Sequence, residues 1–275
     1  MTLLLVFHAS DGLLLLADGR RTKDPGEGNG DPFIFKNDAR KTAIAPTERA
    51  VAMAAGHSEI NGEVVADIFA AAMARAMSEE PDTPPDDGTY WSPVETGSVE
   101  HLSRACFEAL RKRWAELQLE GRATWGVVAG YDPEGRTPTA YRFVVGNAGA
   151  ERPTPVDVAA TSILAIPLCS DEDIGHLVRS RFGLMTPLEV EQYFDRIEEE
   201  PDLPWRDSYT LFDMSLEEVF AQVTTAMPEL IMHHWDELDS AGVGGDWIVY
   251  LLPADGSATK RQFAWGPTRP VGSPA

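Results

Sequence analysis

The second residue of the chain is a threonine that could act as a nucleophile once Met1 is removed. Methionine aminopeptidase accepts a small residue such as Thr2 in this position, so the α-amine of Thr2 would become the free amino terminus. A free amino-terminal threonine is a complete hydrolytic pair, because its hydroxyl attacks and its own α-amine takes up the proton. The ordinary pKa of an α-amine is about 7.7 to 8.0, and nearby positive charge lowers it. Such chemistry calls for a lysine close to Thr2 and a carboxylate that holds the lysine.

The residues after Thr2 predict a hairpin of buried strands. Two apolar runs, Leu3 to Phe7 and Leu13 to Ala17, flank the sequence Ala9-Ser10-Asp11-Gly12. An Asp-Gly pair between short apolar runs is typical of a tight turn between two strands. Thr2 would therefore stand at the beginning of a buried strand.

The rest of the chain alternates between groups of predicted strands and groups of predicted helices. We expect strands over residues 33–35, 43–55, 123–131, 139–145, 158–166, 247–252 and 261–265, and helices over residues 58–77, 99–119, 172–182, 187–199 and 215–238. Pro228 should kink or interrupt the last helix. Grouped strands and grouped helices are typical of an α+β fold with layered packing. Two sheets face to face with helices outside would bury every apolar stripe, including Met73, Met77 and Trp114.

The composition of the chain argues against several classes of partner and location. The chain has 275 residues, a net charge of −21 and two cysteines, Cys106 and Cys169. The acidic balance argues against nucleic acid and against an anionic membrane surface as partners, because both attract clustered Lys and Arg. No run of about 18 apolar residues is present and no signal peptide is evident, so we expect the chain to begin as printed. Two cysteines make no disulfide framework, and we expect a cytoplasmic protein.

The organisation expected from the sequence is one domain over residues 1–267 and a disordered tail over residues 268–275. No cofactor or metal is expected. His233 and His234 are neighbours on a predicted helix, where adjacent side chains point in different directions. The acidic loop 26–31 lacks the twelve-residue pattern of a calcium loop.

Several motifs occur at the spacing of a known family. Asp18 lies sixteen residues after Thr2, within Ala17-Asp18-Gly19-Arg20-Arg21-Thr22, and Arg40-Lys41 precedes the predicted strand that ends in Ala55-Gly56. Ala129-Gly130-Tyr131-Asp132 and the pair Gly244-Gly245 add to the pattern. On these motifs the sequence resembles the β-type proteasome subunits and the bacterial HslV peptidase, which are amino-terminal nucleophile hydrolases. The resemblance covers most of the chain except residues 183–213, and the loop between residues 23 and 35 is longer than in the family.

This resemblance implies a four-layer α/β/β/α sandwich and a set of catalytic roles. Thr2 would be the nucleophile, Asp18 would orient Lys41, and Lys41 would tune the α-amine of Thr2. The amide of Gly56 would stabilise the oxyanion. Lys36 is the alternative to Lys41. We assign Arg20, Thr22 and Ala54 to substrate binding; the small Ala54 would leave room for a bulky apolar side chain.

Two departures from the family pattern concern residues that support the nucleophile. The family has a serine in a Gly-Ser-Gly turn where this chain reads Leu168-Cys169-Ser170, so Ser170 serves only with a shift. The family also places an aspartate and a second serine where direct alignment gives Ser240 and Val243. Asp239 would supply the carboxylate if one residue is inserted. Loss of these groups would either slow catalysis or indicate a subunit that has no catalytic activity.

Three functions follow. The first is a threonine endopeptidase that cleaves unfolded polypeptides or peptides within a ring-like homo-oligomer. The second is a catalytically silent subunit of the same kind that acts as a scaffold. The third is an amidohydrolase that acts on a small amide. The family that the sequence resembles works in rings, and this resemblance implies an ATPase as a possible partner. The sequence itself does not reveal whether such a partner exists.

Overall fold

The computed structural model describes residues 3–23, 33–36, 38–57, 59–60, 62–78, 94–115, 123–146, 149–156, 163–167, 214–235 and 243–266. In this part of the chain, three α-helices combine with two five-stranded sheets and two small two-stranded ones. The chain divides into two compact units. The first consists of Met1–Asp38, Asp157–Pro253 and Lys260–Ala275, and the second of Ala39–Val156 and Ala254–Thr259.

The first unit is built on a sheet with the strand order β12-β1-β2-β13-β14. These strands are β1 (Leu3–Ala9), β2 (Gly12–Asp18), β12 (Ile163–Pro167), β13 (Asp246–Pro253) and β14 (Thr259–Ala264), and the unit also contains β3 (Arg21–Lys23), β4 (Phe33–Lys36) and helix α6 (Leu216–His233). The predicted hairpin is confirmed, since β1 and β2 pair antiparallel with Ala9 opposite Gly12. The predicted pair near the carboxyl end is confirmed as β13 and β14.

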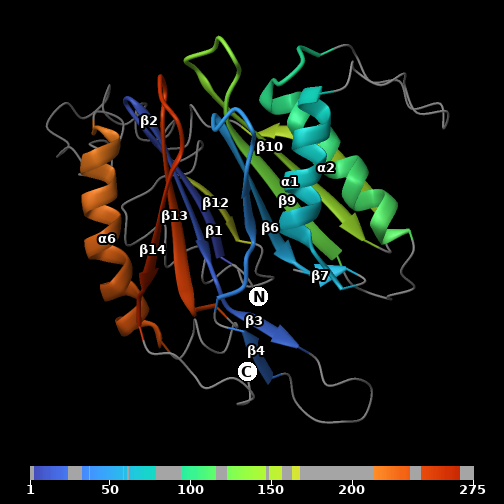
Figure 1. The fold of residues 1–275 in the computed structure, drawn as a ribbon. Coiled ribbons are helices and arrows are strands. Elements are labelled where there is room, and N and C mark those ends of the chain that lie inside the picture. The colour runs from blue at the N-terminus through green and yellow to red at the C-terminus, as the bar shows by residue number, and fades with distance from the viewer. Residues whose placement is uncertain are drawn as a thin grey trace, which may run out of the picture. The chain divides into compact units, whose positions relative to one another are not determined.

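Both faces of the β1–β2 hairpin are buried, which explains its unbroken apolar runs. Leu5 and Leu14 face α6, where they join Val223 and Met227 in one core cluster. Their neighbours on the opposite face of the sheet, such as Leu15, are equally inaccessible to solvent. Figure 1 shows α6 along one side of this sheet. A strand buried on both faces needs apolar residues at every position rather than at alternate ones.

The hairpin turn is fastened to the beginning of α6. Asp11 Oδ1 accepts a hydrogen bond from the Leu216 amide at 2.5 Å, and the Ser10 amide donates to the Met214 carbonyl at 2.9 Å. Ser215 caps the helix and forms a capping box with Glu218. Hydrogen bonds from Ser215 hold the pKa of the exposed Glu218 carboxyl below its ordinary value. The helix runs through Pro228, where the sequence predicted a kink or an interruption.

The second unit contains a sheet with the strand order β11-β10-β9-β6-β5, covered on one face by two helices. Its elements are β5 (Thr42–Ile44), β6 (Ala50–Gly56), β7 (Glu59–Ile60), β8 (Glu63–Val64), α1 (Val65–Ser78), α2 (Val99–Trp114), β9 (Ala123–Tyr131), β10 (Pro138–Gly146) and β11 (Gly149–Val156). Figure 1 shows α1 and α2 side by side. Phe69, Met73 and Cys106 form the core between these helices and the sheet, with Trp114 at the end of α2. The predicted burial of Met73 and Trp114 is confirmed, whereas Met77 is only partly buried against this core. Burial raises the pKa of the Cys106 thiol.

Three predictions of secondary structure in the second unit were wrong. Residues 43–55 form two strands, because Pro46 begins a turn in which Glu48 has a φ of 57°. The first helix begins at Val65 instead of residue 58, since Gly62 turns the chain between β7 and β8 with a φ of 81°. Strand β11 was missed because Pro153 and Pro155 weaken its pattern, although an edge strand tolerates proline.

The predicted helices over residues 172–182 and 187–199 and the tail over residues 268–275 lie outside the described residues. The prediction of one domain over residues 1–267 stays a prediction. No helix within the described ranges has both the length and the hydropathy that crossing a membrane requires.

Candidate functional site

The predicted site begins at a buried carboxylate beside the start of β1. Thr2 itself lies outside the described residues, and its neighbour Leu3 opens β1. Asp18 ends β2 in the position opposite Leu3 and is 1% exposed. Its Oδ1 accepts a hydrogen bond from the Leu3 amide at 2.9 Å. The backbone that follows Thr2 is therefore attached to Asp18.

The second carboxylate oxygen of Asp18 accepts hydrogen bonds from two further backbone amides. Oδ2 accepts hydrogen bonds from the Gly244 amide at 3.2 Å and from the Arg20 amide at 3.3 Å. Burying a carboxylate is costly unless hydrogen bonds compensate for the lost water. Three backbone donors from three parts of the chain supply that compensation here. Asp18 thus joins the first strand, the end of the second strand and the segment before β13.

Gly244 is a site residue that the sequence pattern marks only as half of a glycine pair. Gly244 and Gly245 have φ angles of 148° and 76°, which residues with a side chain rarely adopt. A Cβ atom at position 244 would lie 2.7 Å from Arg20 Nη2. Glycine is needed here for two reasons, the backbone conformation and the approach of a buried guanidinium.

Arg20 has its side chain in the interior of the first unit. It is 1% exposed, and its guanidinium carbon lies 5.4 Å from the centre of the Trp235 ring, which follows α6. Its contacts with Trp235 and Gly244 connect the end of α6 to the segment that donates to Asp18. The predicted role of Arg20 in substrate binding stays a prediction.

Lys41 is buried in the second unit, immediately before β5. It is 3% exposed, and its carbonyl oxygen accepts a hydrogen bond from the Ala54 amide at 2.8 Å. Its neighbour Arg40 has a different environment, since Arg40 is exposed and forms an ion pair with Asp67 of α1. Of the basic pair, Lys41 is the inward-facing member. The contact expected between Lys41 and Asp18 stays a prediction, as does the alternative role of Lys36.

Gly56 ends β6 in a conformation that favours glycine. Its φ is 89°, and a Cβ atom would lie 2.3 Å from the Ala123 carbonyl oxygen. The residue is exposed, as a backbone donor to a substrate must be. Ala54, two residues earlier, packs into the core cluster with α1 and α2, and its predicted role in specificity is untested.

The remaining predicted residues are outside the described side chains. Thr22 pairs with Ile34 through the β3–β4 backbone, and its side chain is not described. Ser170, Asp239 and Ser240 lie outside the described residues. Val243, in the position where the family pattern has a second serine, is fully buried among apolar residues.

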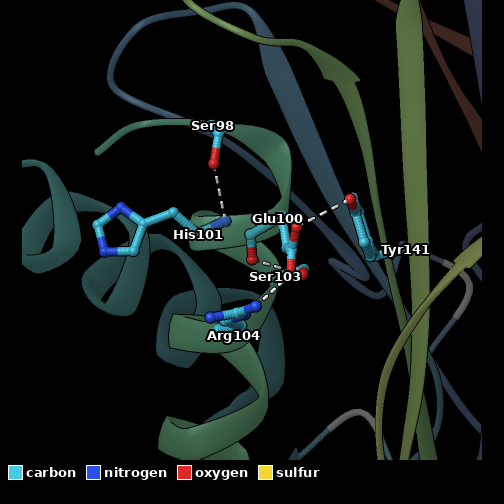
Figure 2. Close-up of polar contacts among 6 residues, drawn as sticks. All are labelled: Ser98, Glu100, His101, Ser103, Arg104 and Tyr141. Carbon is cyan, nitrogen blue, oxygen red and sulfur yellow. Dashed lines mark hydrogen bonds and ion pairs between the residues drawn. The ribbon is translucent and has the colours of Figure 1, made fainter. Parts of the chain in front are cut away.

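A separate polar cluster lies at the beginning of α2 (Figure 2). Glu100 forms an ion pair with Arg104 and accepts a hydrogen bond from the Tyr141 hydroxyl at 3.2 Å. Burial and the charge of Glu100 raise the pKa of Tyr141 to about 12. Burial, and secondarily the charge of Arg104, lower the pKa of His101, whose Nδ1 accepts the Gly97 amide at 3.0 Å. Within the described ranges, no three carboxylate, imidazole or thiol side chains gather as a metal site would require.

Comparison with protein-family models finds no match, and comparison with curated protein sequences finds none. Solved structures do match. Anbu from Yersinia bercovieri, an ancestral beta-subunit, superposes with a TM-score of 0.53 at 12% identity over 96% of this chain and 87% of that chain. The helical assembly of the Anbu complex from Pseudomonas aeruginosa has a TM-score of 0.53 at 14% identity over 96% and 87%. A Gly-1 mutant of Anbu from Hyphomicrobium sp. strain MC1 has a TM-score of 0.51 at 15% identity over 96% and 88%.

These matches correct the assignment made from the motifs. The motifs of the sequence resemble those of β-type proteasome subunits and HslV peptidase, whereas the matched solved structures are Anbu proteins. Short motifs around two strands and a glycine pair do not distinguish between proteins that share a fold. At 12% to 15% identity the likeness concerns the fold alone. The chain therefore has the mixed α/β fold, with antiparallel sheets, that the Anbu structures have.

Proposed function

We propose that this protein is a threonine peptidase in which Thr2 becomes the nucleophile after removal of Met1. The observation that carries the proposal is the hydrogen bond from the Leu3 amide to the buried carboxylate of Asp18. It fixes the backbone directly after Thr2, in the way that a nucleophile at the end of a chain requires. A reacting group must be held in place, because a small displacement costs a large part of the rate.

The proposed reaction begins when the Thr2 hydroxyl adds to the carbonyl carbon of a peptide bond. The hydroxyl proton passes to the α-amine of Thr2, and the amide of Gly56 stabilises the oxyanion. The intermediate then collapses to an ester, and the leaving amine takes the proton from the α-amine. Water attacks the ester by the same route, and its proton replaces the one on the threonine hydroxyl. The positive charge of Lys41, held by Asp18, would favour the neutral, basic form of the α-amine.

The assembly belongs to the same proposal. The Pseudomonas aeruginosa Anbu complex is a helical assembly, and we extend a homo-oligomeric state to this chain. Head-to-tail contacts between copies produce a ring where the rotation closes and a helix where it does not. We also propose a four-layer α/β/β/α sandwich in one domain, supported by the apolar residues buried on both faces of β1, β2, β6 and β9. Unfolded polypeptide or peptide is the proposed substrate, and the cytoplasm the proposed location.

Intact-mass analysis with a covalent probe tests the nucleophile. An epoxyketone reacts with both the hydroxyl and the α-amine of an amino-terminal threonine. We expect the chain to lack Met1 and to gain one probe mass, with the adduct located on Thr2. Thr2→Ala is the matched control, because alanine also permits removal of Met1 but has no hydroxyl, and it should give no adduct. Lys41→Ala should form the adduct more slowly. A processed wild-type chain that never forms the adduct would contradict the proposal.

One observation favours a second candidate, the catalytically silent subunit. Val243 is a fully buried apolar residue in the position where the family pattern places a serine that supports the nucleophile. A processed chain that assembles into oligomers but forms no adduct would establish this alternative. Hydrolysis of small amides but not of peptides would instead establish an amidohydrolase.

A further inference from the structure

We propose that helix α2 aims the amide of Gly56 through the ring of His57, so that His57 and Trp114 are positioning residues for the reaction. This inference rests on the proposed function, in which the Gly56 amide stabilises the oxyanion. It adds two residues that neither the motifs nor the sequence spacing indicated. All the contacts that carry it lie within the second unit.

Gly56 is the last residue of β6 and pairs with Thr124 of β9 at the point where the strand ends. Its φ of 89° is open to glycine, and glycine is also the residue with the greatest backbone freedom. A peptide amide stabilises an oxyanion only when it is directed at the place where the charge develops. The conformation of Gly56 must therefore be fixed by its neighbours rather than by its own side chain.

His57 is held at both its backbone and its ring. Its carbonyl oxygen accepts a hydrogen bond from Thr124 Oγ1 at 3.4 Å, and Thr124 is fully buried in β9. Its imidazole meets the indole of Trp114 edge-on, with the ring centres 5.3 Å apart and an angle of 65° between the planes. Trp114 is 4% exposed. The residue after Gly56 is thus attached to β9 on one side and to the end of α2 on the other.

The opposite end of α2 is anchored to the same sheet, as Figure 2 shows in part. Ser98 Oγ caps the helix by accepting the His101 amide at 3.1 Å, and the Val99 amide donates to Asp132 Oδ1 at 2.8 Å. Glu100 accepts a hydrogen bond from Tyr141 of β10. Asp132 follows β9, whereas Thr124 lies at its beginning. Helix α2 is therefore fastened to the sheet near both ends of β9, and Trp114 has little freedom to move.

A contact that merely fills the core would affect stability without a specific effect on the reaction. The chain offers a matched control, because Phe107 of the same helix makes a similar edge-on contact with Phe143 at 5.9 Å. Phe107→Leu removes an aromatic contact of α2 within the core. Trp114→Leu removes the contact with His57. Trp114→Phe keeps an aromatic ring and serves as the conservative variant.

Two measurements test the inference. The first is peptide hydrolysis at a temperature where each variant is folded. Trp114→Leu should lower kcat by about 10- to 100-fold with little change in KM, because a misdirected donor retains part of the effect of an oxyanion amide. Trp114→Phe should retain most of the wild-type kcat, and Phe107→Leu should have a kcat near the wild-type value. Equal effects of Trp114→Leu and Phe107→Leu on kcat would overturn the inference.

The second measurement does not depend on activity. Amide hydrogen exchange should become about tenfold faster in the peptide that contains Gly56 in Trp114→Leu but not in Phe107→Leu. Unchanged exchange in Trp114→Leu would overturn the inference even if the probe labels Thr2. Faster exchange at Gly56, together with a wild-type chain that forms no adduct, would instead uphold the positioning by α2 and refute the proposed peptidase.

Discussion

The amide of Leu3 donates a hydrogen bond to Asp18 Oδ1 over 2.9 Å, across the first two strands of the protein. The same carboxylate accepts the amides of Arg20 and Gly244, so it joins segments 226 residues apart in the chain. A buried acceptor with three donors organises the backbone around the proposed nucleophile more rigidly than an ion pair at the surface would. The first prediction follows from this arrangement.

Asp18→Asn should destabilise the protein by about 1 to 3 kcal/mol. Asparagine has an NH2 group in place of one carboxylate oxygen, so at least one backbone N–H group would face another donor and lose its acceptor. Asp11→Asn is the matched control. Asp11 is exposed and accepts the Leu216 amide through Oδ1, so asparagine keeps an acceptor oxygen for that amide. Urea denaturation of both variants measures the difference. Equal losses of unfolding free energy would show that the three amides around Asp18 contribute nothing specific.

Gly56→Ala should be more harmful than Gly62→Ala. The two glycines have similar φ angles of 89° and 81°, so the backbone strain is comparable. A Cβ atom at Gly56 would lie 2.3 Å from the Ala123 carbonyl oxygen, whereas one at Gly62 would meet nothing within 4 Å. We expect about 1 to 2 kcal/mol of destabilisation at Gly62 and clearly more at Gly56. Thermal or urea unfolding measures both, and comparable values would contradict the close approach to Ala123.

Gly244 and Arg20 should be energetically coupled. Gly244→Ala forces a methyl group to within 2.7 Å of the Arg20 guanidinium, and that side chain is 1% exposed. Removing the guanidinium with Arg20→Ala relieves the clash. The double variant should therefore be more stable than the sum of the single effects predicts, by about 0.5 to 3 kcal/mol. Additive effects in a double-mutant cycle measured by urea unfolding would refute the contact.

The unfolding free energy of the protein should decrease as the pH is lowered, in part because of His101. Burial and the charge of Arg104 lower the pKa of His101 from its ordinary 6.5, and its Nδ1 already accepts the Gly97 amide. As the pH falls through about 6.5, His101 is protonated in the unfolded chain but stays neutral in the folded chain. The unfolding free energy therefore decreases. The loss ends once the pH passes below the folded-state pKa.

His101→Asn isolates this contribution. Asparagine has an acceptor oxygen near the position of Nδ1 but does not titrate. Between pH 7.5 and pH 5.5 the wild type should lose more unfolding free energy than His101→Asn, as measured by urea denaturation at several pH values. Parallel profiles for the two proteins would show that His101 does not contribute to the pH dependence.

Much of the local structure could be predicted because its causes are local. The Asp11-Gly12 pair between two apolar runs predicts the β1–β2 hairpin, whose two-residue turn is Ser10-Asp11, and Asp132-Pro133-Glu134-Gly135 lies between β9 and β10. The apolar face of residues 99–119 predicts a helix, and α2 spans Val99–Trp114. Where a single residue changes the direction of the chain, the predictions were wrong. Pro46 and Gly62 divided what looked like continuous elements, and Pro153 and Pro155 concealed an edge strand.

The sequence by itself determined the β1–β2 hairpin, helix α2 and the β13–β14 pair, since apolar periodicity and turn residues act over a few positions. It also placed Asp18 at the end of the second apolar run, sixteen residues after Thr2. Only the tertiary structure decided that Gly244 donates to Asp18, that Arg20 is enclosed by Trp235 and Gly244, and that His57 meets Trp114. These contacts join residues far apart in the chain. They depend on how complete strands and helices pack, which no local pattern of residues specifies.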